Sequence, residues 1–205
     1  MIVLHHLRIG RSIFTVWLLE ELGLEYELKV YHRDPATFLA PPELKRVHPL
    51  GKSPVIEDDG LVLSESGAIT AYLLRRYDTE GRFAPPADDL KPWARYTQWL
   101  HYPEGSVFAP LLVKMLLQRS SQPHVLLEGY SRREIKLHLD HIAAQLGSRQ
   151  FILGETFSGA DFGVTYVVSL AARLGQLEPY ASLQAYLKRN LDRPAYHRAI
   201  ARAVE

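Results

Sequence analysis

The segment from His48 to Ser66 places the tightest constraint on how this chain can fold. A short apolar run at Val55–Ile56 is followed by Asp58–Gly60, which has the acidic-glycine composition of a tight turn. The apolar residues Leu61–Leu63 then return, which predicts a β-hairpin. Glu65–Ser66 opens a segment with helical apolar spacing, so a strand-to-helix junction with free backbone N–H groups is expected there. Such a junction suits a small anion, in particular a carboxylate.

The residues before this segment predict alternating strands and helices. Ile2–His5 reads as a buried strand, Ser12–Leu22 as a well-buried helix that ends at Gly23, and Glu25–Tyr31 as a half-buried strand. A short helix is expected at Glu43–Val47, and the helix that begins at Ser66 is expected to end near Tyr77. The order strand, helix, strand, helix, strand, strand, helix matches a thioredoxin-like α/β domain with one parallel pair and an antiparallel hairpin.

Everything after a breaker-rich linker reads as helix. Residues 1–77 are expected to form the thioredoxin-like domain, 78–88 the linker, and 89–205 an all-helical domain. The predicted helices are Leu90–Gln118 with bends near Pro103 and Pro110, Ser131–Leu146, Gly159–Leu174, Leu183–Asn190 and Pro194–Val204. The fold class is therefore α/β followed by all-α.

Composition narrows the chemistry. The chain has 205 residues, 47% of them hydrophobic and 23% charged, and a net charge of +1, so nothing in the total favours nucleic acid or an anionic membrane as a partner. The absence of cysteine removes disulfides, thiolate metal sites and a cysteine nucleophile. No apolar run reaches the length of a membrane span and no signal-peptide pattern is present, so we expect a cytoplasmic protein.

Several motifs, in order along the chain, carry a specific resemblance. They are Trp17–Leu24 with Tyr26, Ala40–Lys45, Gly51-Lys52-Ser53-Pro54-Val55 followed by Glu65-Ser66, Gly154-Glu155, and Phe157–Asp161. In this order and spacing the chain resembles the cytosolic glutathione S-transferase superfamily, most closely a bacterial and fungal subgroup.

The resemblance implies an enzyme that binds glutathione, stabilises its thiolate and transfers it to a small hydrophobic electrophile, as in detoxification. Glutathione would be a cosubstrate, with no other cofactor and no metal. A homodimer is also implied. Two alternatives stay open: a non-catalytic glutathione-binding or protein-interaction module of the same fold, and a glutathione-dependent peroxidase or disulfide reductase.

Glu65 and Ser66 suit the α-amino acid end of glutathione's γ-glutamyl group. The Ser66 hydroxyl and N–H at a helix start can bind a carboxylate, and Glu65 supplies the charge for an ammonium. The alternative is an N-cap serine beside a surface glutamate.

By the resemblance, Pro54 follows a cis peptide bond, and Ser53 binds the cysteinyl backbone of glutathione in the manner of an added strand. Lys52 lies near enough to hold a glutathione carboxylate, or is simply a solvated turn lysine.

The loop His6–Ser12 is expected to carry the thiol chemistry. An ordinary thiol has a pKa of about 8.5, and a reduction by two units requires about 2.7 kcal/mol of thiolate-selective stabilisation. The catalytic serine of the serine-type family members falls at Gly10, which has no side chain. Ser12 and Arg11 are the nearest donors and are the predicted catalytic residues, although Ser12 also suits a helix N-cap.

In the second half, Ser158 and Asp161 have the spacing of a capping box, with Phe157 and Phe162 as its hydrophobic staple, and are predicted to be structural. Tyr102 and Ser106 are the predicted residues of the electrophile pocket, by analogy with the family. Paired histidines such as His138 and His141 lack the partners of a zinc motif, so no metal site is expected.

Overall fold

The computed structural model describes residues 1–203 and divides into two compact units. The first unit comprises Met1–Gly81 together with the chain from Leu191 onward, and the second comprises Arg82–Asn190. This division differs from the expected boundaries of 1–77 and 89–205, because the last helix belongs to the first unit.

The first unit is built on a four-stranded mixed sheet in the order β2-β1-β3-β4. The strands are β1 (Ile2–Leu7), β2 (Tyr26–Tyr31), β3 (Val55–Asp58) and β4 (Leu61–Ser64). β1 pairs in parallel with β2 and antiparallel with β3, and β3 and β4 form the antiparallel hairpin. The thioredoxin-like fold class is therefore confirmed.

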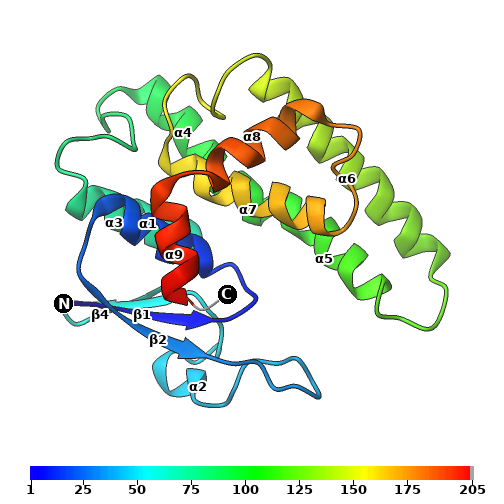
Figure 1. The fold of residues 1–205 in the computed structure, drawn as a ribbon, viewed down its shortest axis with the longest axis horizontal. Coiled ribbons are helices and arrows are strands. Elements are labelled where there is room, and N and C mark those ends of the chain that lie inside the picture. Colours follow the sequence, from blue (N-terminus) through cyan, green and yellow to red (C-terminus); the bar gives the residue numbers. More distant parts are fainter. Residues whose placement is uncertain (204–205) are drawn as a thin grey trace. The chain divides into compact units, whose positions relative to one another are not determined.

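Helices complete the first unit: α1 (Ile13–Leu22), α2 (Leu44–Val47), α3 (Ser66–Tyr77) and α9 (Pro194–Ala203). In Figure 1, α1, α3 and α9 lie on one side of the sheet and α2 lies on the other. Residues 13–19 of α1 are all buried, as expected for a helix that is apolar around most of its circumference. Gly23 ends α1 in the left-handed conformation, at φ 67°. The predicted helix end at Val204 lies outside the described residues.

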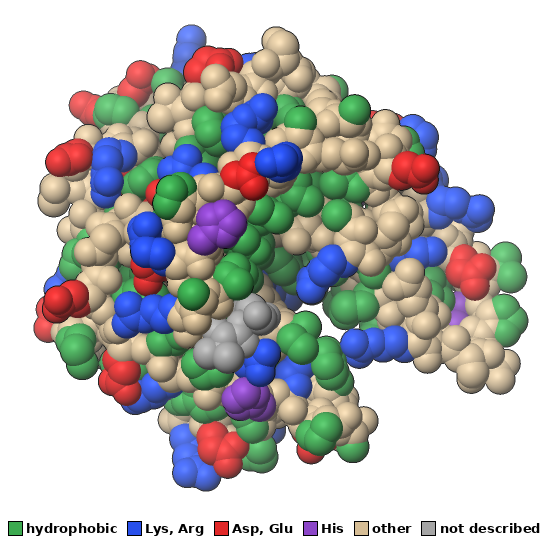
Figure 2. Space-filling view, viewed as in Figure 1, with side chains coloured by type: hydrophobic (Ala, Val, Ile, Leu, Met, Phe, Trp, Pro, Cys, Tyr) green, Lys and Arg blue, Asp and Glu red, His purple; other side chains and the backbone are tan. Residues whose placement is uncertain are grey.

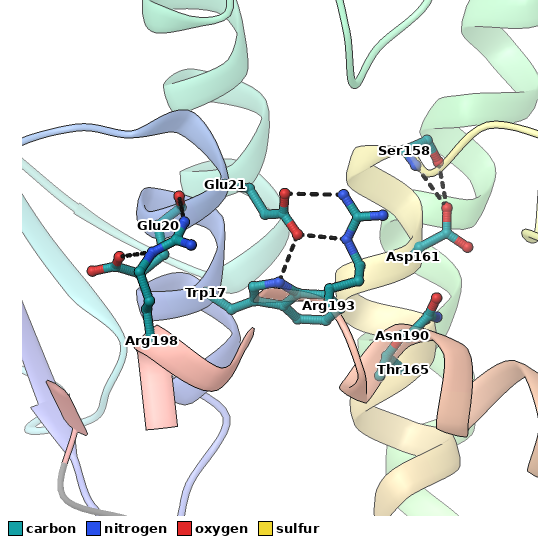
Figure 3. Close-up of polar contacts among 9 residues, drawn as sticks. All are labelled: Trp17, Glu20, Glu21, Ser158, Asp161, Thr165, Asn190, Arg193 and Arg198. Carbon is teal, nitrogen blue, oxygen red and sulfur yellow. Dashed lines mark hydrogen bonds and ion pairs between the residues drawn. The ribbon is translucent and has the colours of Figure 1, made fainter. Parts of the chain in front are cut away.

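Two charged contacts fasten α9 and Arg193, the residue just before it, to α1. Glu21 accepts hydrogen bonds from the Arg193 guanidinium at 2.5 and 3.0 Å and from the Trp17 indole at 2.9 Å (Figure 3). One turn away, Arg198 donates to the Glu20 carboxylate at 3.1 Å and to its backbone carbonyl at 2.9 Å. Trp17 is fully buried. The last helix is therefore part of the core of the first unit.

A buried carboxylate connects α3 to the hairpin. Asp58, 3% exposed, accepts hydrogen bonds from Tyr77 at 2.6 Å and Tyr72 at 2.9 Å, and Arg76 lies 3.7 Å away. Burial raises the pKa of Asp58, but the two tyrosine hydroxyls and the Arg76 charge outweigh it, so the pKa lies below its usual value. This contact fixes α3, whose first residue is Ser66.

The second unit is helical, as predicted. Its helices are α4 (Leu90–Tyr102), a π-helical turn at Pro103–Val107, α5 (Phe108–Leu117), α6 (Val125–Leu146), α7 (Gly159–Arg173) and α8 (Ala181–Leu191). Where a bend was predicted near Pro103, the α-helical pattern is interrupted by the π-helical turn that begins at this proline, which lacks the N–H that continues an α-helix. Pro110 lies in the first turn of α5, and the α-helical pattern continues through it from Phe108 to Leu117. α6 starts earlier than the expected Ser131.

α7 is the buried centre of the second unit, and it begins with the predicted capping box. The Ser158 N–H donates to the Asp161 carboxylate at 2.8 Å, and the Ser158 hydroxyl donates at 2.9 Å (Figure 3). Phe157 packs edge-on against Phe162 with ring centroids 5.0 Å apart. Asp161 also accepts from the Ile152 N–H and the Tyr186 hydroxyl, which compensates the cost of burying this carboxylate.

Charged side chains of both signs are spread over the face seen in Figure 2, in keeping with the net charge of +1. Within residues 1–203, no helix combines the length and apolarity needed to span a bilayer.

We predict that the contact between α1 and α9 contributes to global stability. Arg193→Ala should lower the free energy of unfolding by about 1.5–3 kcal/mol, because Glu21, whose side chain is 10% exposed, would lose its charged donor. Chemical denaturation of the wild type, Arg193→Ala, Glu21→Gln and the double variant forms a thermodynamic cycle. A coupling energy of zero would contradict the assigned contact.

The Asp58 cluster predicts a specific pH dependence. A carboxyl whose pKa is lowered by folding contributes stability above its ordinary pKa of about 3.9, and this contribution is lost as the pH falls through the folded value. Asp58→Asn should therefore be less stable than wild type at neutral pH, and the difference should narrow on acidification below about pH 4. Denaturation midpoints measured over a pH series check this. A difference that stays constant with pH would show that the Asp58 charge is not stabilised by folding.

Candidate functional site

Two serines far apart in sequence meet at one backbone amide at the end of β1. The Leu7 N–H lies 3.1 Å from the Ser53 hydroxyl oxygen and 3.2 Å from the Ser12 hydroxyl oxygen, and both act as acceptors. The Ser53 hydroxyl donates in turn to the His5 carbonyl at 2.8 Å. The end of β1, the start of α1 and the turn before β3 are thereby held together.

The Ser53–Pro54 peptide bond is cis, as the resemblance implies. The Ser53 side chain is used within the fold, so any ligand contact falls to its backbone. Within residues 1–203, the Ser53 N–H and carbonyl make no backbone hydrogen bond. Pro54 is buried and leads into β3. These groups are thus available to pair with an extended peptide, which is the role predicted for Ser53.

The start of α3 has two unusual features at adjacent residues. Glu65, an exposed residue, is the N-cap and has φ 71° and ψ 116°, a conformation that residues other than glycine rarely adopt. Ser66 follows as the first helical residue, and its buried hydroxyl has no hydrogen-bond partner among residues 1–203. Backbone strain and an unpaired buried hydroxyl each cost about 1–3 kcal/mol, and such costs are concentrated at functional sites.

The alternative role of Ser66 as an N-cap residue is not what the structure shows, since Glu65 occupies that position and no side chain caps the helix. The unpaired Ser66 hydroxyl and the N–H groups of the first turn nevertheless lie at the start of α3, and the acidic Glu65 is the adjacent residue. A carboxylate beside an ammonium, as in an α-amino acid, complements this set of groups. Lys52 is an exposed residue next to Ser53, and among residues 1–203 its side chain has no hydrogen bond or ion pair.

Ser12 lies deeper than predicted. The residue is fully buried, and its hydroxyl lies 2.9 Å from His6 Nδ1 and 3.3 Å from the Leu7 carbonyl, in addition to accepting from the Leu7 N–H. It does not cap α1. This geometry argues against Ser12 as a donor to a ligand thiol, because its hydroxyl is screened and already bonded within the protein. Arg11 is partly exposed and has contacts within the protein.

The loop between β1 and α1 has a further partner that the sequence did not indicate. Arg33, which follows β2, donates to the Ile9 carbonyl from Nε at 3.3 Å and from Nη2 at 3.1 Å. A Cβ built on Gly10 would lie 3.3 Å from the same Nη2 and only 2.9 Å from the Leu7 carbonyl oxygen. The space that a side chain at position 10 would occupy is therefore already filled by protein atoms.

Tyr102 and Ser106 both belong to the second unit, where Tyr102 ends α4 and Ser106 lies in the π-helical turn. The Tyr102 hydroxyl is 2.6 Å from His138 Nδ1, and burial raises the pKa of Tyr102 to about 12. Tyr102 also packs edge-on against Trp99 and His141. The role of Tyr102 and Ser106 in an electrophile pocket stays a prediction. Within the described chain, no group of three or more histidine or carboxylate side chains is placed to bind a metal ion.

Comparison with known proteins agrees with this geometry. The family model described as "Glutathione S-transferase, N-terminal domain" matches residues 1–75, and "Glutathione S-transferase, C-terminal domain" matches residues 117–189. Glutathione S-transferase 3 of Schizosaccharomyces pombe is 35% identical over 95% of this chain and 85% of its own length. Glutathione S-transferase 1 of Saccharomyces cerevisiae is 30% identical over 96% and 92%.

Solved structures extend the similarity to the whole fold. A glutathione S-transferase from Actinobacillus pleuropneumoniae has a TM-score of 0.90 and 36% identity, covering 100% of this chain and 93% of its own. A sphingomonad glutathione S-transferase complexed with glutathione shares the fold, with a TM-score of 0.83 and 22% identity over 98% of both chains. The two domain models and the curated relatives together place this chain in the glutathione S-transferase family.

Proposed function

We propose that this glutathione transferase binds glutathione along the end of β1 and the start of α3, and transfers its sulfur to a small hydrophobic electrophile. The unpaired buried Ser66 hydroxyl beside the left-handed Glu65 is the observation that carries the proposal. Both features are unfavourable for folding alone, and a bound α-amino acid group would use both.

The groups that can bind glutathione determine how this tripeptide lies in the site. Its γ-glutamyl carboxylate binds Ser66 and the first-turn N–H groups, and its ammonium pairs with Glu65. Its cysteinyl backbone pairs with the Ser53 N–H and carbonyl, and Lys52 binds a glutathione carboxylate. Because the Ser53 side chain is bonded to His5 and Leu7, a cysteinyl residue paired with Ser53 lies beside the end of β1 and the loop that follows it.

The reaction needs the thiolate. The thiol proton passes to solvent, the sulfur forms a bond to an electrophilic carbon, and the leaving group departs with the bonding electron pair. The protein's part is to hold the thiolate and the electrophile in contact. Tyr102 and Ser106 are the proposed contacts for the electrophile, and a cytoplasmic homodimer is the proposed form of the enzyme.

Retention on immobilised glutathione, followed by assays with an aryl halide and with an organic hydroperoxide, tests the proposed activity. Turnover of the aryl halide supports transfer. Retention without turnover of either compound would favour a binding module, and turnover of the hydroperoxide alone would favour a glutathione peroxidase.

Ser66→Ala should weaken glutathione binding by about 1.5–3 kcal/mol, because a hydroxyl that contacts a charged carboxylate is lost. Stability should hardly change, since the Ser66 hydroxyl has no partner among the described residues to lose. Calorimetric titration with glutathione and a thermal melt measure the two effects. Ser64→Ala is the matched control, because the Ser64 hydroxyl is 3.3 Å from His48 within the fold. Unchanged affinity in folded Ser66→Ala would rule out this site.

Ser12→Ala, in contrast to Ser66→Ala, should lower stability and leave the thiol chemistry unchanged. It should lower the free energy of unfolding by about 1–3 kcal/mol, because the Leu7 N–H and the His6 imidazole each lose a buried partner. The pKa of the bound glutathione thiol should stay as in wild type. Titration of the thiolate absorbance of bound glutathione measures that pKa. If it rises in the folded variant, the catalytic role first predicted for Ser12 is restored.

A further inference from the structure

Arg33 binds two backbone carbonyls that belong to different loops. Besides the two hydrogen bonds to Ile9 described above, its Nη1 donates to the Phe38 carbonyl at 3.2 Å, and its guanidinium carbon lies 4.9 Å from the centre of the Phe38 ring. Ile9 is in the loop after β1, and Phe38 is in the loop after β2. One guanidinium therefore links the two loops.

Both residues that Arg33 holds have left-handed backbones. Ile9 has φ 55° and Phe38 has φ 60°. A positive φ is a genuine outlier for a β-branched residue such as isoleucine, and the surrounding structure must maintain it. Ile9 is also 54% exposed, so burial of its side chain does not account for the conformation.

The guanidinium also occupies a specific place. Nη2 lies 3.3 Å from where Gly10 would carry a Cβ, and the Leu7 carbonyl at 2.9 Å leaves no room for that atom. Leu7 is the residue to which the Ser53 hydroxyl is bonded. A positive charge thus lies where a side chain of residue 10 would begin, beside the proposed binding place of the cysteinyl residue.

Other ionisable groups near this loop include Arg8 and Arg11 within it, His6 at the end of β1, and Asp34 next to Arg33. The Asp34 carboxylate accepts from the Ala36 and Thr37 N–H groups and from the Thr37 hydroxyl, so it is turned toward its own loop.

We propose that Arg33 supplies the positive charge that stabilises the glutathione thiolate, in place of the side chain missing at Gly10. This inference rests on the proposed function. A guanidinium keeps its charge at any physiological pH and forms strong charge-assisted contacts with anions. Loss of the thiol proton to solvent leaves a sulfur anion, and a fixed cation near it favours that form.

Two variants separate the charge of Arg33 from its hydrogen bonds. Arg33→Gln keeps amide donors for the loop carbonyls and removes the charge, whereas Arg33→Lys keeps the charge. Thiolate absorbance of enzyme-bound glutathione, titrated against pH, should show a thiol pKa raised by about one unit or more in Arg33→Gln and by less in Arg33→Lys. Turnover below the thiol pKa should fall roughly tenfold in Arg33→Gln. An unchanged thiol pKa in folded Arg33→Gln would overturn the proposal.

A third variant tests whether Arg33 acts only by holding the loop. Glycine adopts a positive φ without strain, so Ile9→Gly should let the loop keep its conformation without Arg33. If Arg33 acted only by fixing that conformation, Ile9→Gly in the Arg33→Gln background would restore the wild-type thiol pKa. We expect the thiol pKa to stay raised in this double variant; a return to the wild-type value would overturn the charge role. Arg11→Ala should produce a smaller rise than Arg33→Gln, and a larger one would assign the charge to Arg11.

Binding of S-methylglutathione, which has no ionisable thiol, distinguishes this inference from the proposed function. Its affinity should be the same in wild type and Arg33→Gln. The exposed Arg75, at the far end of α3, is the matched control, and Arg75→Met should leave the thiol pKa unchanged. If wild type binds S-methylglutathione but its bound glutathione thiol titrates like the free thiol, the binding site stands and the Arg33 proposal falls. If wild type binds neither compound, both fall.

Discussion

The shared hydrogen bond of the Leu7 N–H organises the binding end of the first unit. One amide meets two serine hydroxyls, and these bring the start of α1 and the turn before Pro54 to the end of β1. Both serines sit where the local sequence would also suit a ligand contact, yet their side chains are used to assemble the site. For a ligand, these two serines leave their backbone surroundings: the N–H and carbonyl of Ser53, and the loop that leads into Ser12.

The two helices that begin at the proposed site, α1 and α3, are fixed by contacts near their other ends. α3 carries Ser66 at its first residue and is fastened to the hairpin by Asp58, Tyr72 and Tyr77 near its other end. α1 begins after the thiol loop and is fastened through Glu21 to Arg193. Buried or half-buried charged contacts thus fix each helix away from the ligand. The strained or unpaired groups at Ile9, Glu65 and Ser66 are then left at the binding end.

Periodicity and turn composition predicted most of the fold. The succession of strands and helices along the first unit, the hairpin at Asp58–Gly60, the start of α3 and the capping box of α7 all follow from local signals, because each depends on neighbours within a few residues. The contact between Arg33 and Ile9 does not follow from local signals, because the two residues are far apart in sequence and no spacing rule links them. The burial of Ser12 was missed for a similar reason: a serine before a helix suits a cap equally well, and only the position of Leu7 decides. The early start of α6 was missed because Val125 and Leu126 are exposed apolar residues without an apolar-polar pattern.

The place of α9 has a consequence for how the molecule is made. The chain leaves the first unit after Gly81, builds the whole helical unit, and returns at Leu191. Trp17, fully buried beside Tyr196, is covered by residues that follow the whole helical unit in the sequence. On the ribosome, the helical unit emerges complete while the thioredoxin-like unit still lacks its last layer. The core of the first unit is therefore completed only after the second unit has been synthesised.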